Sequence, residues 1–258
     1  MNLDSITGKT VWLTGASSGI GFELAQLLIK ANNFVIVSAR SKDRLQSLKL
    51  SNGERVTMLP LDVTSDESVR LARQLLNEVT DHLDLVICCA GTCEYDDGPD
   101  LNADMYSRVM NTNFLGTVQT LNMALPLLKK SESRAHIVGV SSLTTEAPFP
   151  RAQAYGASKA ALEYFLESLK VDLDSEGIDV SIVRPGFVDT PLTQKNDFSM
   201  PFLMGTAKAA ELMLQGIKKR KTYINFPKRM CYMLRLLNFS SWFWFKTIAP
   251  KLRRSDSL

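Results

Sequence analysis

The sequence predicts an α/β protein built on a doubly wound parallel sheet of about seven strands, with helices on both faces. Short runs of apolar and β-branched residues alternate with segments of helical periodicity, and no internal repeat interrupts them. The runs are apolar throughout, as expected for strands that are covered on both faces. A length of 258 residues with a 45% apolar share suits a well-packed core.

The predicted elements follow one another from the N-terminus. Residues 10–13 form a first strand, and after a glycine-rich turn apolar residues recur at helical spacing between Ile20 and Leu28. Residues 64–67 form a capping-box pattern, which predicts the start of a helix. Six further strands are predicted at residues 34–38, 56–61, 83–89, 136–141, 179–183 and 222–226. We therefore place one domain at residues 1–226 and a C-terminal extension at residues 227–258.

Composition excludes several classes of protein. The four cysteines show no disulfide framework, which favours a reducing compartment. The first residues lack a basic segment followed by an apolar run, so we expect no secretory signal and a cytoplasmic location. A net charge of +3 is too small to indicate a nucleic-acid partner.

The segment TGASSGIG, residues 14–21, joins the first strand to the first helix. Gly15 permits a tight turn, Gly19 lets the backbone approach a pyrophosphate, and Gly21 lets the helix pack closely on the sheet. The helix N-terminus presents free N–H groups and a positive dipole end to phosphates. The spacing differs from the G-x-G-x-x-G fingerprint, and a plain glycine turn is the alternative interpretation.

The residues after the second strand indicate which dinucleotide is bound. The neutral Ala39 and then Arg40 stand where many such proteins have an acid for the ribose 2'-hydroxyl. Arg40 can pair with a 2'-phosphate, and Ser41 or Ser17 can add hydroxyl donors. This pattern predicts NADP rather than NAD, with a solvated loop arginine as the alternative. Asp62, just past the third strand, is placed to accept a hydrogen bond from the adenine amino group. The alternative is an acid that only marks the start of a helix.

Tyr155 and Lys159 lie four residues apart, which places a phenol and an ammonium on one helix face. A fixed cation favours the phenolate, so Lys159 is expected to lower the pKa of Tyr155. Ser141 and Ser142 end the preceding strand, where the sites of α/β proteins form. These serines favour catalysis over the usual surface role of such a pair.

Taken together, these motifs resemble the short-chain dehydrogenase/reductase family, in its single-domain, NADP-preferring oxidoreductase branch with a Rossmann-type fold. The resemblance covers residues 8–226 and rests on the order of TGASSGIG, LDVT, CCAG, NFLG, a serine pair ahead of Y-x-x-x-K, and RPGFVDT. It implies a catalytic tetrad of Asn113, Ser142, Tyr155 and Lys159. It implies contacts with NADP(H) by Gly15, Ser17, Ser18, Gly19, Ile20, Gly21, Arg40, Asp62, Val63, Ala90, Gly91, Asn113, Tyr155, Lys159, Pro185, Gly186, Val188 and Thr190.

The resemblance also implies a reaction, in which a carbonyl and an alcohol are interconverted. Tyr155 would protonate the carbonyl oxygen as hydride reaches the carbon, and Ser142 would polarise that oxygen. Lys159 would hold the nicotinamide ribose, and the main-chain carbonyl of Asn113 would link Lys159 to solvent through a water. The alternative is a catalytically silent NADP-binding sensor or interaction protein, which the intact tetrad disfavours. Family members are usually dimers or tetramers, so a homodimer or tetramer is expected.

Cys88 and Cys89 stand where the family usually has two asparagines, so bracing of the neighbouring strands must differ here. Their spacing with Cys93 matches no common zinc pattern. We therefore expect buried thiols and no metal site.

The segment at about residues 190–206 is expected to close over the substrate. It carries five adaptable apolar residues: Phe198, Met200, Phe202, Leu203 and Met204. The segment therefore predicts a small hydrophobic or lipid-like substrate, with a core or dimer contact as the alternative.

The C-terminal extension is both apolar and basic. On a helix, one apolar face comprises Met230, Met233, Leu234 and Leu237, and a second comprises Tyr232, Leu236 and Phe239. Polar residues interrupt the run too often for it to span a bilayer. Two interpretations stay open. The extension packs on protein, as a subunit contact or a lid over its own pocket, or it lies peripherally on the inner face of a membrane, with tryptophans at the headgroups. In the second case the flanking cations are Lys246, Lys251, Arg253 and Arg254.

Overall fold

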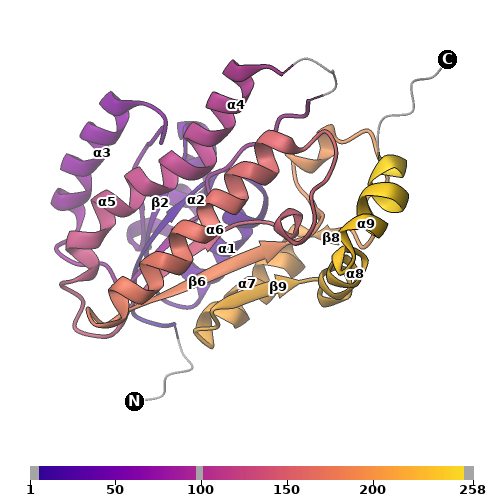
Figure 1. The fold of residues 1–258 in the computed structure, drawn as a ribbon. Helices are drawn as coiled ribbons and strands as arrows, with labels where there is room; N and C mark the ends of the chain where they lie inside the picture. Colours follow the sequence, from indigo (N-terminus) through magenta and orange to yellow (C-terminus); the bar gives the residue numbers. More distant parts are fainter. Residues whose placement is uncertain (1–5, 97–100, 253–258) are drawn as a thin grey trace.

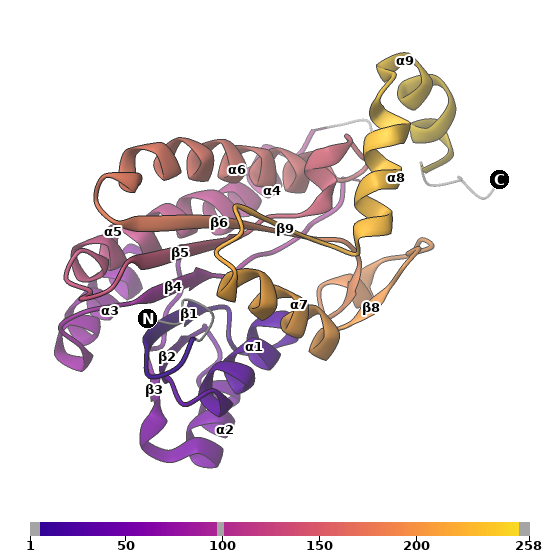
Figure 2. The same ribbon diagram turned by 90° about the horizontal axis from the view of Figure 1, so that it is seen from below.

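The computed structural model describes residues 6–96 and 101–252 and has a seven-stranded parallel sheet at its centre (Figures 1 and 2). The strands are β1 (Thr10–Thr14), β2 (Phe34–Ser38), β3 (Val56–Met58), β4 (Leu85–Cys88), β5 (Ala135–Val140), β6 (Ile178–Pro185) and β9 (Tyr223–Phe226). Their order across the sheet is β3-β2-β1-β4-β5-β6-β9, and each neighbouring pair is parallel. The strand order reverses between β1 and β4, which is where ligands bind in doubly wound sheets. The predicted fold class is confirmed.

Helices cover both faces of the sheet. They are α1 (Gly19–Lys30), α2 (Lys42–Asn52), α3 (Asp66–Val79), α4 (Ala103–Met110), α5 (Gly116–Leu128), α6 (Gln153–Asp174) and α7 (Thr206–Lys218), with 3₁₀ turns η1 (Gly53–Arg55), η3 (Leu143–Glu146) and η4 (Thr193–Lys195). Buried side chains of α1, α2 and α7 join one core, and those of α3, α5 and α6 join the core of the opposite face. The two layers lie on either side of the sheet in Figure 2.

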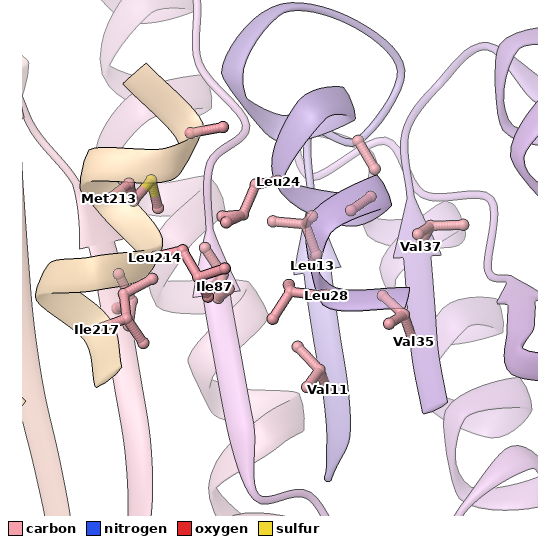
Figure 3. Close-up of a cluster of buried hydrophobic side chains, with 14 of the residues drawn as sticks. Val11, Leu13, Leu24, Leu28, Val35, Val37, Ile87, Met213, Leu214 and Ile217 are labelled. Atoms are coloured by element: carbon pink, nitrogen blue, oxygen red, sulfur yellow. The ribbon is translucent and has the colours of Figure 1, made fainter. Parts of the chain in front are cut away.

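The two cores follow from the alternation of side chains along each strand. In β1, Val11 and Leu13 point into the core beneath α1 and α7, whereas Trp12 belongs to the opposite core. Figure 3 shows the first of these cores, with Leu24 and Leu28 of α1 lying over β1. Each such side chain contributes about 1.5–3 kcal/mol by leaving water.

Two local features differ from the sequence-based expectation. The third strand ends at Met58 rather than at residue 61, although Leu59 and Leu61 still donate to the carbonyls of Val37 and Ala39. A small parallel pair, β7 (Val188–Asp189) with β8 (Met204–Gly205), was not predicted. This pair closes the base of the segment that was expected to cover the substrate.

The C-terminal extension lies at the carboxyl end of the sheet, next to β6 and β9 (Figures 1 and 2). It comprises α8 (Lys228–Asn238), α9 (Ser241–Phe243), a π-helical turn η5 (Trp244–Ile248) and a 3₁₀ turn η6 (Ala249–Leu252). Met230, Leu234 and Trp244 pack with Leu143 and Ala147 of the main domain. One face of the extension therefore packs on its own chain. None of the described helices has the length and apolar character needed to cross a bilayer, and Arg253 and Arg254 lie outside the described residues.

A buried histidine in β5 makes stability depend on pH. His136 contacts the Ser181 hydroxyl at 2.7 Å, and burial, helped by the Arg220 charge, lowers its pKa to about 3. The unfolded chain, with a histidine pKa of about 6.5, binds one more proton than the folded chain below that pH. We therefore expect the free energy of unfolding to fall as the pH drops from 7 to 5, by up to about 1.4 kcal/mol per unit.

Urea unfolding at several pH values in this range measures the effect. The matched variant His136→Asn cannot titrate, so its free energy of unfolding should change much less between pH 7 and 5. Equal slopes for the wild type and the variant would contradict the assignment.

Candidate active site

A cavity of about 640 Å³ lies where the strand order reverses, along the carboxyl ends of the central strands. Its lining comes from the residues that follow β1, β2, β4, β5 and β6. Every cofactor contact implied by the sequence lines this cavity except Asn113, whose neighbour Thr112 does. The strand ends thus bring together motifs that are far apart in the chain.

The turn after β1 is shaped to receive a diphosphate. Gly15 has a φ of +75°, and a Cβ there would lie 2.6 Å from the Ala90 nitrogen. A Cβ on Gly21 would collide with the Gly15 carbonyl. Only glycine fits at both positions. The first N–H groups of α1 have no helical acceptors, and Gly19, Ile20 and Gly21 line the cavity. The residues present therefore fit a dinucleotide.

The cavity lining also carries a cation. Arg40 is exposed and lines the cavity with Ser17 and Ser41. Asp62 accepts the N–H and hydroxyl of Thr64, at 2.9 and 2.7 Å. Burial tends to raise the pKa of Asp62, but these bonds and the Arg40 charge hold it below its usual value. The carboxylate is therefore ionised. Its hydrogen bonds with Thr64 fix the turn that precedes α3.

Tyr155, Ser142 and Lys159 meet in the middle of the cavity wall. Desolvation raises the pKa of Tyr155, and hydrogen bonding to Ser142 opposes that shift. The Lys159 ammonium lies 5.7 Å from the tyrosine ring centroid and donates to the Val140 carbonyl at 2.8 Å. Burial lowers the pKa of Lys159 to about 8. The expected lowering of the Tyr155 pKa by Lys159 is therefore not found in this geometry, and the phenol is protonated, the form that can donate a proton.

Asn113 lies in a π-helical turn, η2 (Asn111–Leu115), between α4 and α5, and its side chain is fully buried. The amide accepts from the N–H of Thr92 at 2.8 Å and donates to the Thr92 carbonyl and the Ser158 hydroxyl, both at 2.9 Å. Its main-chain carbonyl accepts from the Thr117 hydroxyl at 3.2 Å. A Cβ on Gly91 would lie 3.3 Å from Asn113 Oδ1 and 3.5 Å from Lys159 Nζ. Asn113 thus fixes the loop after β4 beside Lys159.

The cysteines differ in part from the expectation of buried thiols. Cys88 is buried in β4, but Cys89 is only half-buried and lines the dinucleotide cavity. Cys93 is also half-buried. Desolvation raises the pKa of both Cys89 and Cys93 to about 11, so both are neutral thiols. Within residues 6–96 and 101–252, no three histidine, cysteine or acidic side chains gather in a metal-binding group.

A second, mostly apolar cavity of about 360 Å³ adjoins the first. Six residues line both cavities: Ser142, Tyr155, Pro185, Gly186, Leu192 and Thr193. The predicted cover segment contributes Phe198, and the extension contributes Met230, Met233, Leu234, Leu237, Trp244 and Ile248. Sequence reasoning missed Tyr95, Phe149 and Phe187, which also line this cavity. No local pattern marks them, because each enters the cavity from a separate loop.

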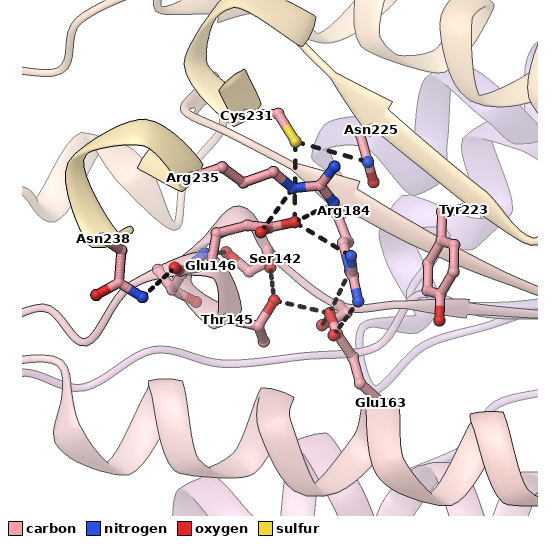
Figure 4. Close-up of polar contacts among 12 residues, drawn as sticks. Ser142, Thr145, Glu146, Glu163, Arg184, Tyr223, Asn225, Cys231, Arg235 and Asn238 are labelled. Carbon is pink, nitrogen blue, oxygen red and sulfur yellow. Dashed lines mark hydrogen bonds and ion pairs between the residues drawn. The ribbon is translucent and has the colours of Figure 1, made fainter. Parts of the chain in front are cut away.

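The extension is attached to the rest of the chain through ion pairs (Figure 4) and through a buried tryptophan. Arg184 of β6 donates to Glu163 of α6 at 2.6 and 2.9 Å and to Glu146 of η3 at 3.1 Å. Arg235 of α8 donates two further bonds to Glu146, at 2.8 and 2.9 Å. Trp244 Nε1 donates to the Pro148 carbonyl at 2.9 Å. The extension is therefore held as a wall of the second cavity.

Comparisons with known proteins agree with this geometry. The family model of the short chain dehydrogenases matches residues 9–199. An uncharacterized oxidoreductase of Myxococcus xanthus is 36% identical over 231 residues, which cover 88% of this chain and 91% of the relative. The 11-beta-hydroxysteroid dehydrogenase-like 3 protein of Arabidopsis thaliana is 32% identical over 254 residues, covering 92% of this chain and 79% of the relative.

Solved structures show the same fold. A short chain dehydrogenase/reductase from Burkholderia phymatum, solved with NAD, superposes with a TM-score of 0.82 at 20% identity, covering 91% of this chain and 94% of the other. The L-sorbose reductase of Gluconobacter frateurii, solved with NADPH and L-sorbose, gives 0.75 at 23% identity, covering 86% and 94%. The family match and the relatives together show that this chain belongs to the short chain dehydrogenase family of oxidoreductases.

Proposed function

We propose that the protein is an NADP(H)-dependent oxidoreductase that interconverts a carbonyl and an alcohol on a hydrophobic substrate. One observation carries this proposal. Ser142 and Tyr155 line both the dinucleotide-sized cavity and the apolar cavity, so they stand where a cofactor and a substrate would meet. A nucleotide sensor has no need for an apolar cavity at that junction.

The side chains at the junction can perform the proton chemistry of carbonyl reduction. A nicotinamide cofactor supplies hydride to the carbonyl carbon when it is bound. The neutral phenol of Tyr155 donates its proton to the carbonyl oxygen, and the product is the alcohol. Ser142 Oγ accepts the N–H of Thr144 at 3.1 Å and hydrogen-bonds Tyr155, so its hydroxyl stands beside the phenol, where it can turn to donate to the same carbonyl oxygen. Lys159 places a buried cation 5.7 Å from the ring centroid of Tyr155.

The substrate class follows from the walls of the second cavity. Apolar side chains from the main domain face those of the extension, including Phe149 and Phe187 opposite Met233 and Leu237. Burial of each methylene of a ligand in such a site contributes about 0.8 kcal/mol. A small hydrophobic or lipid-like ketone, aldehyde or alcohol is therefore the best match.

The preference for NADP rests on Arg40. The cavity end that it lines also holds the hydroxyls of Ser17 and Ser41, and no acidic residue follows β2 before Asp43. A guanidinium with nearby hydroxyls suits a 2'-phosphate, while a ribose 2'-hydroxyl would normally meet an acid. Similar folds have been solved with NAD and with NADPH, so the fold alone does not select the cofactor. The proposed preference for NADP therefore rests on the side chains at this end of the cavity.

Replacement of the proposed acid tests the function. We expect Tyr155→Phe to lower kcat for NADPH-dependent reduction of long-chain ketones and aldehydes by about 10²- to 10⁴-fold, because the proton donor is lost. Binding of NADPH, measured by fluorescence titration, should stay within about twofold, since the ring remains.

Tyr164→Phe is the matched control, because Tyr164 lies on the same helix and is exposed. It should behave as the wild type does. An unchanged rate for Tyr155→Phe across the panel would refute the acid role, and a wild type that binds NADPH without reducing any member of the panel would favour the nucleotide sensor.

The cofactor preference has its own test. Arg40→Ala should weaken NADPH binding by about 10- to 100-fold and leave NADH binding nearly unchanged. This loss of affinity corresponds to the removal of one charged hydrogen-bonded pair. Arg44→Ala, an exposed position on α2 outside the cavity lining, serves as the control. Equal affinity of the wild type for NADH and NADPH in the same titration would defeat the assignment.

A further inference from the structure

The extension has a second face, whose side chains belong to none of the hydrophobic cores of the described residues. Of the large apolar side chains that are exposed in residues 6–96 and 101–252, seven of eighteen lie in the short span between residues 232 and 252. Tyr232 and Leu236 of α8, with Phe239 directly after this helix, form the second face that the sequence predicted. Phe239 is 91% exposed and Trp242 is 71% exposed. Such a concentration of exposed aromatic residues indicates a binding surface.

The extension also contributes to the mouth of the apolar cavity. Among the residues that line the cavity, the exposed ones are Phe198, Ser199, Pro201, Lys251 and Leu252. They belong to two segments, the cover segment and η6, so the cavity opens between those segments. Phe202 and Leu203, next to Pro201, are exposed as well. Apolar side chains therefore surround the opening on both sides.

The charge of this surface selects its partner. No acidic residue occurs between Glu211 and Asp256. The cations Lys228, Arg229, Lys246 and Lys251 are exposed, and no acid of the described residues pairs with them. A second copy docked face to face would bring like charges together. An anionic surface would instead attract them.

We propose that the outer face, here meaning Tyr232, Leu236, Phe239, Trp242, Phe243 and Phe245 with their flanking cations, binds the surface of an anionic membrane. Tryptophan and phenylalanine settle at the boundary of headgroups and acyl chains, and lysines bind anionic headgroups. The extension lies on the bilayer, because no described helix is able to span it. The cavity mouth then faces the lipid, from which an apolar substrate enters. Membrane binding stands independently of the proposed reaction.

Sedimentation of the full chain with vesicles tests the proposal. We expect the protein to pellet with vesicles of phosphatidylcholine and phosphatidylserine, less with phosphatidylcholine alone, and less at high salt. The triple variant Phe239→Ser, Trp242→Ser, Phe245→Ser should bind about tenfold more weakly or worse. The control Tyr164→Ser, Val171→Ser removes equally exposed apolar side chains from α6 and should still pellet.

Charge reversal provides a second arm. Lys246→Glu should weaken binding to the mixed vesicles by about tenfold, because two charge units change at the surface. Lys219→Glu makes the same change at the end of α7, away from the outer face, and should have little effect.

Three results would overturn the proposal. They are no pelleting of the wild type, equal pelleting of the triple variant, or failure of both proteins to bind vesicles while the wild type is an oligomer and the triple variant is a monomer.

Reduction of a water-soluble carbonyl without vesicles separates this proposal from the proposed function. The triple variant should keep the wild-type rate, since none of its three positions lines a cavity. An inactive wild type would refute the reaction and leave the membrane result standing.

Discussion

The buried ion-pair chain centred on Arg184 determines where the functional elements lie. The side chains of Arg184, Glu163 and Glu146 are only 11%, 9% and 12% exposed. Charges that leave water are tolerated when they are paired and hydrogen-bonded, and removal of one partner is costly. Glu163 also accepts the Ser141 hydroxyl at 2.6 Å, and it lies one turn beyond Lys159 on α6. These ion pairs thus link β6, α6 and the segment that carries Ser142. Through Arg235 they also link all three to the extension.

This linkage holds the extension as a wall of the apolar cavity. The dinucleotide-sized cavity comes from the sheet and its glycine turn, which need no extension. The apolar cavity depends on α8 and Trp244 for one wall. A Cβ on Gly186 would lie 2.6 Å from Met230 Sδ, so α8 packs directly on the turn that separates the two cavities. If the proposed function holds, substrate choice depends on residues more than 70 positions beyond Tyr155.

Local patterns predicted the fold, and nearly all residues that they assign to the dinucleotide lie along one cavity, because both depend on short-range features. Gly21 is dictated by a backbone contact with Gly15 in the same turn, and continuous apolar strands predict a sheet that is covered on both faces. The partners of Arg184 were not predictable, since Glu146 and Glu163 come from elements that only the folded sheet brings together. For the same reason the two faces of the extension were visible in the sequence, but their environments were not. One face packs on its own chain, and the other is exposed.

Chain-length dependence of the reaction tests the central claim, that the extension forms a wall of the substrate cavity. Leu237 lines this cavity, whereas its neighbour Leu236 is exposed. With a series of straight-chain aldehydes, kcat/KM of the wild type should rise with chain length, by up to about fourfold per methylene. Leu237→Trp should abolish that rise and keep the rate for short aldehydes, while Leu236→Trp should match the wild type. Parallel chain-length profiles for all three proteins would contradict the account.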